Sequence, residues 1–210
     1  MSSRIPVLGL MAVVMTALRG EPARAQASRG SQDVQIYAGY IFGDRLTEGP
    51  LSGDHPRLDD DPTYGARYTY HFTQRWGIQL SAGYSPNRVA HVASGASNLG
   101  LTTLDLDLEW DILPDLQFAG HSLVPYSVVG VGYAWANLDH PVSGLAGGTS
   151  ITIKDSNGYT GNAGLGAKYY LRDNLFVDFD ARYRYMSKLA SNYGQGLNTA
   201  ETTLSVGYRF

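Results

Sequence analysis

Eight residues near the middle of the chain, Leu104 to Asp111, alternate without interruption between apolar and acidic side chains. Successive side chains of a strand point to opposite faces, so a strand would place every apolar residue on one face and every carboxylate on the other. A helix of the same residues would carry carboxylates around its whole circumference. The run therefore predicts a β-strand with one apolar and one acidic face.

The same period of two recurs in seven other segments of the chain. With the first run, the alternating segments are residues 34–43, 64–72, 76–84, 104–111, 126–135, 159–171, 175–185 and 201–210. A tilted strand of about ten residues is long enough to cross a bilayer. Glycines such as Gly130 and Gly132 recur on the polar faces, where they leave room for long side chains or water.

The last of these segments ends on Phe210, with Leu204, Val206 and Tyr208 on the same face. In a soluble sheet, a terminal strand with a bare apolar face and an unpaired edge invites aggregation. In a closed membrane barrel the strand pairs on both sides and its apolar face meets lipid. A soluble β-sandwich is the weaker alternative.

The connections between the segments alternate in length. Residues 44–62, 86–100, 137–156 and 187–199 are long and polar, whereas residues 73–75 and 172–174 are tight turns and residues 113–122 are intermediate. Long external loops and short periplasmic turns are typical of outer-membrane barrels. We therefore predict an all-β fold, an eight-stranded antiparallel up-and-down transmembrane barrel.

Aromatic residues are expected at the two ends of these strands, with aliphatic residues between them. The rim of long loops would carry Tyr40, Phe42, Tyr64, Tyr84, Tyr133, Trp135, Tyr159, Tyr183 and Tyr185, and the opposite rim Phe72, Trp76, Trp110, Tyr169, Tyr208 and Phe210. Aromatic girdles at the headgroup level are a property of membrane barrels.

The first residues have the pattern of a secretory signal. Arg4 precedes an uncharged apolar run over residues 7–18, and the small-x-small triplet Ala23 to Ala25 follows. We expect residues 1–25 to be a cleaved signal peptide, with a cut after Ala27 as the alternative, and residues 26–210 to be the barrel domain. The sequence has no cysteine, which excludes disulfides and thiol catalysis, and its net charge of −3 gives no basis for nucleic-acid binding.

These features resemble the small, porin-like outer-membrane β-barrel proteins of Gram-negative bacteria. The resemblance rests on the signal segment, the Pro125-Tyr126 start of a glycine-alternating strand, the glycines at 161, 164 and 166, and the terminal Gly207 to Phe210. It implies location in the outer membrane. It also implies that Leu204, Val206, Tyr208 and Phe210 form the signal read by the outer-membrane assembly machinery.

An eight-stranded barrel is filled by its own side chains, so the inward charges should form a packed polar network. The expected members are Arg67, Asp105, Asp107, Glu109, Lys168, Asp178, Asp180, Arg182, Arg184, Glu201 and Arg209. Their signs nearly balance, and Arg182 or Arg67 is the expected partner of Asp107. A structural role is favoured, and an ion path or proton relay is the alternative.

The sequence gives little support for catalysis or metal binding at other positions. His71 points inward, the other histidines lack a convincing serine and acid partner, and Asp59 to Asp61 with Asp54 lack the register of a calcium loop. We expect no enzyme activity, no cofactor and no metal. The expected role is structural or surface-interactive through the long loops, in a monomer whose partners are outer-membrane lipid, lipopolysaccharide and the assembly machinery. A narrow channel and a lipid-modifying hydrolase are the alternatives.

Overall fold

The computed structural model describes residues 27–43, 57–90, 97–114, 116–140, 142–146, 149–153, 155–187 and 196–210. The expected signal segment, residues 1–25, and Asp54 lie outside these ranges. The strands are β1 (Gln32–Phe42), β2 (Arg57–Leu58), β3 (Asp61–His71), β4 (Trp76–Ala90), β5 (Ser97–Asp111), β6 (Gln117–Phe118), β7 (His121–Leu138), β8 (Val142–Ala146), β9 (Thr149–Ile153), β10 (Ser156–Tyr170), β11 (Leu175–Met186) and β12 (Leu197–Arg209).

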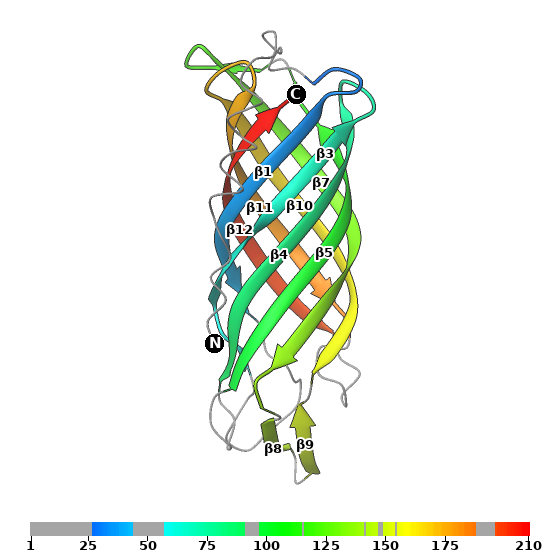
Figure 1. Ribbon diagram of the computed structural model, residues 1–210, viewed down its shortest axis with the longest axis vertical. Helices are drawn as coiled ribbons and strands as arrows, with labels where there is room; N and C mark the ends of the chain where they lie inside the picture. The colour runs from blue at the N-terminus through cyan, green and yellow to red at the C-terminus, as the bar shows by residue number, and fades with distance from the viewer. Residues whose placement is uncertain are drawn as a thin grey trace, which may run out of the picture.

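Eight long strands close into an antiparallel barrel (Figure 1). Each long strand pairs with the next along the chain, in the order β1, β3, β4, β5, β7, β10, β11 and β12. The ring closes where β12 pairs with β1 over ten residue pairs, from Asp33 opposite Arg209 to Phe42 opposite Ala200. Closure removes both sheet edges, so every strand of the ring has two hydrogen-bonded neighbours. The predicted eight-stranded up-and-down barrel is confirmed.

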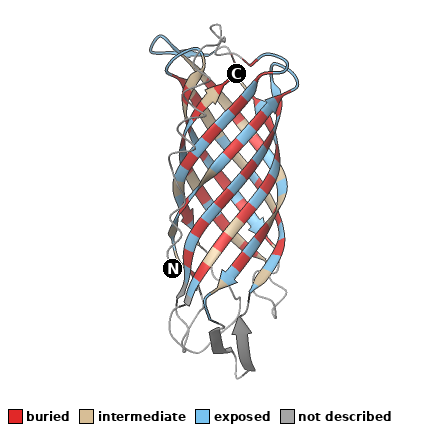
Figure 2. Ribbon diagram, in the orientation of Figure 1, coloured by how far each residue is buried: buried red, intermediate tan, exposed pale blue. Residues whose placement is uncertain are grey.

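Burial alternates along the strands and produces a chequerboard over the barrel wall (Figure 2). On β5, Leu106 is 55 % exposed, whereas the next residue, Asp107, is 1 % exposed. The same parity holds on β1, where Ile36 points outward and Gln35 points into the lumen. The predicted inward and outward faces are therefore those of the structure.

Several strands are longer than the sequence indicated. Residues 86–100 were expected to form a loop, but β4 continues through Pro86 to Ala90 and β5 already begins at Ser97. The side chain of Pro86 faces outward, and Ser85 and Asn87 on either side of it keep the inward parity. His121 and Ser122, expected in a connection, are the first residues of β7.

The two ends of the barrel differ. One end, at the top of Figure 1, carries the carboxyl terminus and the short connections at residues 72–75, 112–120 and 171–174; we call it the short-turn end. The opposite, long-loop end carries the separate two-stranded sheet of β8 and β9. Among the described residues, no helix is long and apolar enough to span a membrane.

Aromatic contacts mark both rims. Tyr64 packs on Tyr84 near the long-loop end, with ring centroids 5.6 Å apart. Trp76 stacks on Trp110 near the short-turn end, with centroids 5.8 Å apart. Exposed aliphatic residues such as Leu106 lie between the rims. This is the distribution expected of a wall that crosses a bilayer.

Candidate functional site: the charged lumen

All eleven residues of the expected polar network are buried inside the barrel. They are Arg67, Asp105, Asp107, Glu109, Lys168, Asp178, Asp180, Arg182, Arg184, Glu201 and Arg209. Because the odd residues of β5 and the even residues of β10 and β11 share the inward parity, the acidic and basic side chains meet across the lumen. They form three layers along the barrel axis.

The layer nearest the long-loop end is organised by Arg184 of β11. Its Nη2 lies 2.7 Å from Asp105 Oδ2 on β5, and its Nη1 lies 2.7 Å from Glu201 Oε2 on β12. Asp105 Oδ1 also accepts a hydrogen bond of 2.8 Å from the hydroxyl of Thr160. One guanidinium thus connects walls that are not neighbours in the sheet.

The middle layer contains two arginines. Arg182 donates to Asp107 and to Asp180, each at 2.7 Å, and its third nitrogen, Nη2, donates to Gln79 at 2.6 Å. Arg67, from β3, donates to Asp180 at 3.3 Å and lies 3.8 Å from Asp178. Of the two partners considered for Asp107, Arg182 is the one that pairs with it. The Arg182 side chain crosses the lumen from β11 to β4 and β5.

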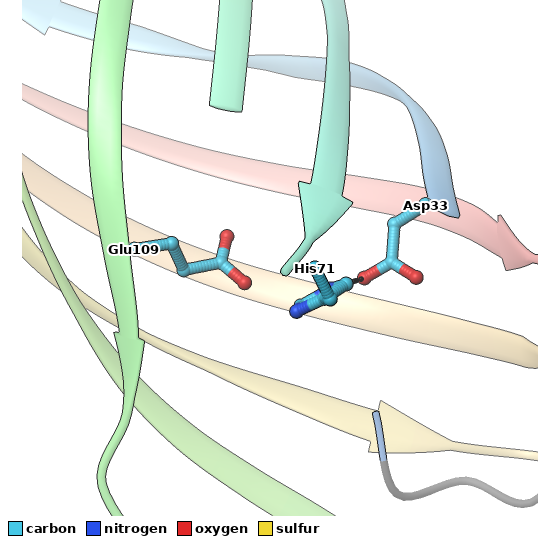
Figure 3. A group of neighbouring side chains, drawn as sticks. All are labelled: Asp33, His71 and Glu109. Atoms are coloured by element: carbon cyan, nitrogen blue, oxygen red, sulfur yellow. Dashed lines mark hydrogen bonds and ion pairs between the residues drawn. The ribbon is translucent and has the colours of Figure 1, made fainter. Parts of the chain in front are cut away.

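The layer nearest the short-turn end joins five strands, β1, β3, β5, β10 and β12. Lys168 Nζ lies 3.0 Å from Asp33 Oδ2 and 2.5 Å from Glu109 Oε1. Arg209 donates from Nε and Nη2 to the two carboxylate oxygens of Asp33, at 2.6 and 2.7 Å. His71 Nε2 lies 3.0 Å from Asp33 Oδ2, and Figure 3 shows the imidazole between Asp33 and Glu109.

Asp33, His71 and Glu109 are close enough together to offer three ligand atoms to a metal ion. However, Lys168 already contacts both carboxylates, and Arg209 holds both oxygens of Asp33. A divalent ion here would lie beside two fixed positive charges in a poorly screened interior. These side chains therefore fit the ammonium group of Lys168 better than a metal ion, and we assign no metal to the site.

Two lumenal carboxylates were missing from the expected network. Asp33 lies just before the first alternating segment, and Asp111 lies at the end of its own segment; both are buried. The described lumen therefore contains eight buried carboxylates, five buried lysine or arginine side chains, and His71. The expectation of near balance was wrong, since the carboxylates exceed the permanent cations by three.

Small residues on β7 make room for this network. A Cβ atom at Gly130 would collide with the Asp107 carboxylate and one at Gly132 with that of Asp105. Because β7 lies between β5 and β10, these glycines let Asp107 reach Asn162 at 2.8 Å and Asp105 reach Thr160. The hydrogen bonds of Asp107 and Asp105 to β10 therefore require glycine at positions 130 and 132 of β7.

An apolar cluster occupies the lumen at the long-loop end. Its members are Ile41, Leu58, Leu99, Leu101, Ala134, Ala136, Met186 and Leu197, all buried. Apart from Leu58 of β2, they come from β1, β11 and β12 on one side of the ring and from β5 and β7 on the other, so the cluster crosses the lumen. The sequence prediction missed it, although Leu99 and Leu101 share the inward parity of Asp105.

Residues considered for catalysis or cation binding lie apart from one another. His71 belongs to the charged layer nearest the short-turn end. His121 Nδ1 hydrogen-bonds the backbone oxygen of Tyr170 at 3.1 Å. Near the long-loop end, Asp60 accepts from the Gly43 backbone at 2.9 Å and Asp61 from the Arg88 backbone at 3.1 Å. The side chains of Leu204 and Val206 are exposed on the outer face of β12, and that of Phe210, the residue after β12, is also exposed.

A closed eight-stranded barrel with an apolar outer band and a charged interior defines an integral membrane β-barrel protein. Residues 8–210 match the family described as the outer membrane protein beta-barrel domain. The chain belongs to this family, and its location is the outer membrane of Gram-negative bacteria. No curated protein matches the sequence at a significant level.

Several solved structures share the fold. The chain is similar to OprG from Pseudomonas aeruginosa, with 17 % identity and a TM-score of 0.58 over 89 % of this chain and 99 % of that one. It is also similar to Neisserial surface protein A, with 15 % identity and a TM-score of 0.58 over 87 % and 100 %. Ail of Yersinia pestis matches with 18 % identity and a TM-score of 0.52 over 87 % and 99 %.

Proposed function

We propose that this protein is a non-conducting outer-membrane barrel that stabilises the membrane and presents its long connections at the cell surface. The observation that carries the proposal is the set of side chains that cross the lumen. Arg182 and Arg184 each link strands from different parts of the ring, and the apolar cluster that includes Leu99 and Leu101 crosses the lumen beyond them. An interior filled in this way leaves recognition to the segments outside the membrane.

Recording from purified protein in a planar lipid bilayer tests this proposal. We expect no stable conductance steps of the size that porins give. As a matched variant, Arg182→Ala with Arg184→Ala removes the two crossing side chains and should admit ions if these side chains form the barrier. Stable porin-sized steps in the unmodified protein would overturn the proposal.

The excess of lumenal carboxylates favours a second candidate, a narrow path for small cations. Eight carboxylates face five permanent cations, so an ion that enters the described lumen meets a negative interior. The same bilayer recording separates the two candidates. Small, cation-selective steps that weaken in Asp107→Asn would support the path, whereas a silent bilayer supports the structural role.

We further propose that the protein is not an enzyme. His71 is engaged with Asp33 inside the barrel, away from lipid, and the exposed His121 hydrogen-bonds a backbone oxygen through Nδ1 rather than a serine or a carboxylate. The hydrolase alternative predicts release of fatty acid from phospholipid by folded protein. Turnover that is abolished in His121→Ala would contradict the proposal.

The outer face of β12 is the proposed signal for the assembly machinery. Phe210 is exposed on the lipid-facing side, where its ring contacts Tyr208 with centroids 4.9 Å apart. We expect Phe210→Ala to reduce the heat-modifiable folded form in membrane fractions, while protein refolded in vitro keeps its barrel. Normal levels of the folded form in cells would refute this role. We also propose that the protein is a monomer and that it contacts outer-membrane lipid and lipopolysaccharide.

A further inference from the structure

An open hollow of about 730 Å³ lies on the outer surface at the short-turn end. Its lining consists of Arg29, Phe72, Thr73, Gln74, Arg75 and Trp76. Phe72 and Trp76 are exposed large hydrophobic residues of the aromatic rim, so the hollow opens at the level of the lipid headgroups. Short turns face the periplasm in barrels of this class, which places the hollow at the periplasmic leaflet.

The two arginines of the hollow come from different segments that the backbone clamps together. Gly30 N donates to His71 O at 2.7 Å, and His71 N donates to Ser31 O at 2.9 Å. Gly30 adopts a φ of +91°, which allows the tight turn that carries Arg29 beside the β3–β4 turn.

The β3–β4 turn is fixed by its own hydrogen bonds. Thr73 Oγ1 accepts from the backbone nitrogens of Trp76 at 2.9 Å and Arg75 at 3.2 Å. The backbone oxygen of Arg75 accepts from Asp111 N at 2.8 Å. The backbone positions of Arg29 and Arg75 are therefore set before any ligand arrives, which lowers the entropic cost of binding.

The hollow has a net positive charge. Neither Arg29 nor Arg75 forms an ion pair with any residue that the structure describes, and no acidic residue lines the hollow. By contrast, the five cations of the lumen all pair with carboxylates. Two exposed guanidinium groups beside Trp76 and Phe72 fit a ligand that has an anionic oxygen cluster joined to an apolar chain.

We propose that this hollow binds the headgroup phosphate of an anionic phospholipid of the periplasmic leaflet. Arg29 and Arg75 contact the phosphate oxygens, while Phe72 and Trp76 pack against the glycerol and upper acyl region. The site is independent of the proposed role of the long loops, because it lies at the opposite end of the barrel and requires only the outer-membrane location.

Fluorescence quenching by brominated lipids tests the site directly. The chain has three tryptophans, and Trp135→Phe leaves the stacked pair of Trp76 and Trp110 as the reporter beside the hollow. The protein is placed in vesicles that contain both phosphatidylcholine and phosphatidylglycerol. Its tryptophan fluorescence is compared between vesicles in which only the phosphatidylcholine is brominated and vesicles in which only the phosphatidylglycerol is brominated. We expect brominated phosphatidylglycerol to quench preferentially, by a factor of about five for each arginine.

Arg29→Gln and Arg75→Gln should each lose about fivefold of that preference, and the double variant should lose it completely. Arg172→Gln is the matched control, because Arg172 lies in the short turn between β10 and β11 and does not line the hollow. Heat-modifiable gel mobility verifies that every variant is folded. Equal quenching by both lipids, an unchanged preference in the double variant, or displacement by millimolar glycerol phosphate would overturn the proposal.

Discussion

The outer wall and the lumen are built from alternate residues of the same strands, yet they follow different rules. On β5, Leu104, Leu106 and Leu108 meet lipid and need only be apolar and of suitable size. Asp105, Asp107 and Glu109, between them, each contact a particular group on another strand. The outer face is therefore specified by composition, and the inner face by pairwise geometry.

Within the lumen, cations and anions are not equivalent. The described lumen has three more carboxylates than permanent cations, and four of the five cations lie against two carboxylates each. Removing a cation increases the imbalance, while removing an anion decreases it. Single substitutions can test both contrasts, and the expected losses of stability differ between the two faces and between the two signs of charge.

Loss of Arg182 should be the most damaging of these substitutions. Arg182→Met leaves Asp107 and Asp180 without their closest cation in a buried layer. Removing one member of a buried ion pair costs about 3–5 kcal/mol. Denaturant unfolding in lipid vesicles should show this loss, and Arg172→Met in an exposed turn should show none. Equal stability of the two variants would contradict the pairing.

A charge on the outer wall should cost nearly as much. Leu106→Arg places a guanidinium in lipid near the middle of the bilayer, at a cost of about 2–4 kcal/mol. Leu106→Met keeps the site apolar and serves as the control in the same unfolding experiment. If both variants unfold like the unmodified protein, residue 106 does not face the hydrocarbon.

Filling one of the β7 glycines should have an intermediate effect. Gly132→Ala brings a methyl group against the Asp105 carboxylate and the Leu104 backbone, and overpacking of this kind costs about 1–3 kcal/mol. Gly161→Ala is the control, because nothing lies within 4 Å of a Cβ built at that position. Unfolding midpoints that shift equally in both variants would show that the close approach to Asp105 is unimportant.

Neutralising a lumenal carboxylate should cost least. Asp107→Asn weakens the bond to Arg182, but Arg182 keeps Asp180 and Gln79, and the layer loses surplus negative charge. We expect a loss of about 1 kcal/mol, the size of a single hydrogen-bond change. A loss equal to that of Arg182→Met would mean that the charge excess has no influence on stability.

The sequence was sufficient to predict which residues of each strand face inward or outward, because the outer wall depends only on a period of two. Leu104 to Asp111 had its inward and outward residues assigned correctly, and the ring of eight strands followed from the alternating connection lengths. Strand ends were harder. Pro86 indicated a loop, yet Ser85 and Asn87 continue the inward parity of β4, so extending the parity through the proline would have found the true end.

The lumenal pairs could be predicted only in part. Asp107 had two basic candidates in sequence, and the choice of Arg182 depends on how far β11 is displaced along the axis relative to β5. That displacement follows from the registers of all the intervening strands together, which local alternation does not contain. Asp33 was missed because it precedes the apolar run of β1, although it shares the parity of Gln35.

The orientation of neighbouring residues on β5 tests most directly whether the apolar residues face lipid and the charged residues face the lumen. The sequence has no native cysteine, so Leu106→Cys and Asp107→Cys each provide a single thiol. Folded protein in lipid vesicles is exposed to a thiol reagent confined to the hydrocarbon phase. We expect rapid labelling of Leu106→Cys and protection of Asp107→Cys. The reverse pattern would show that the inward and outward faces are inverted and that the charged network does not face the lumen.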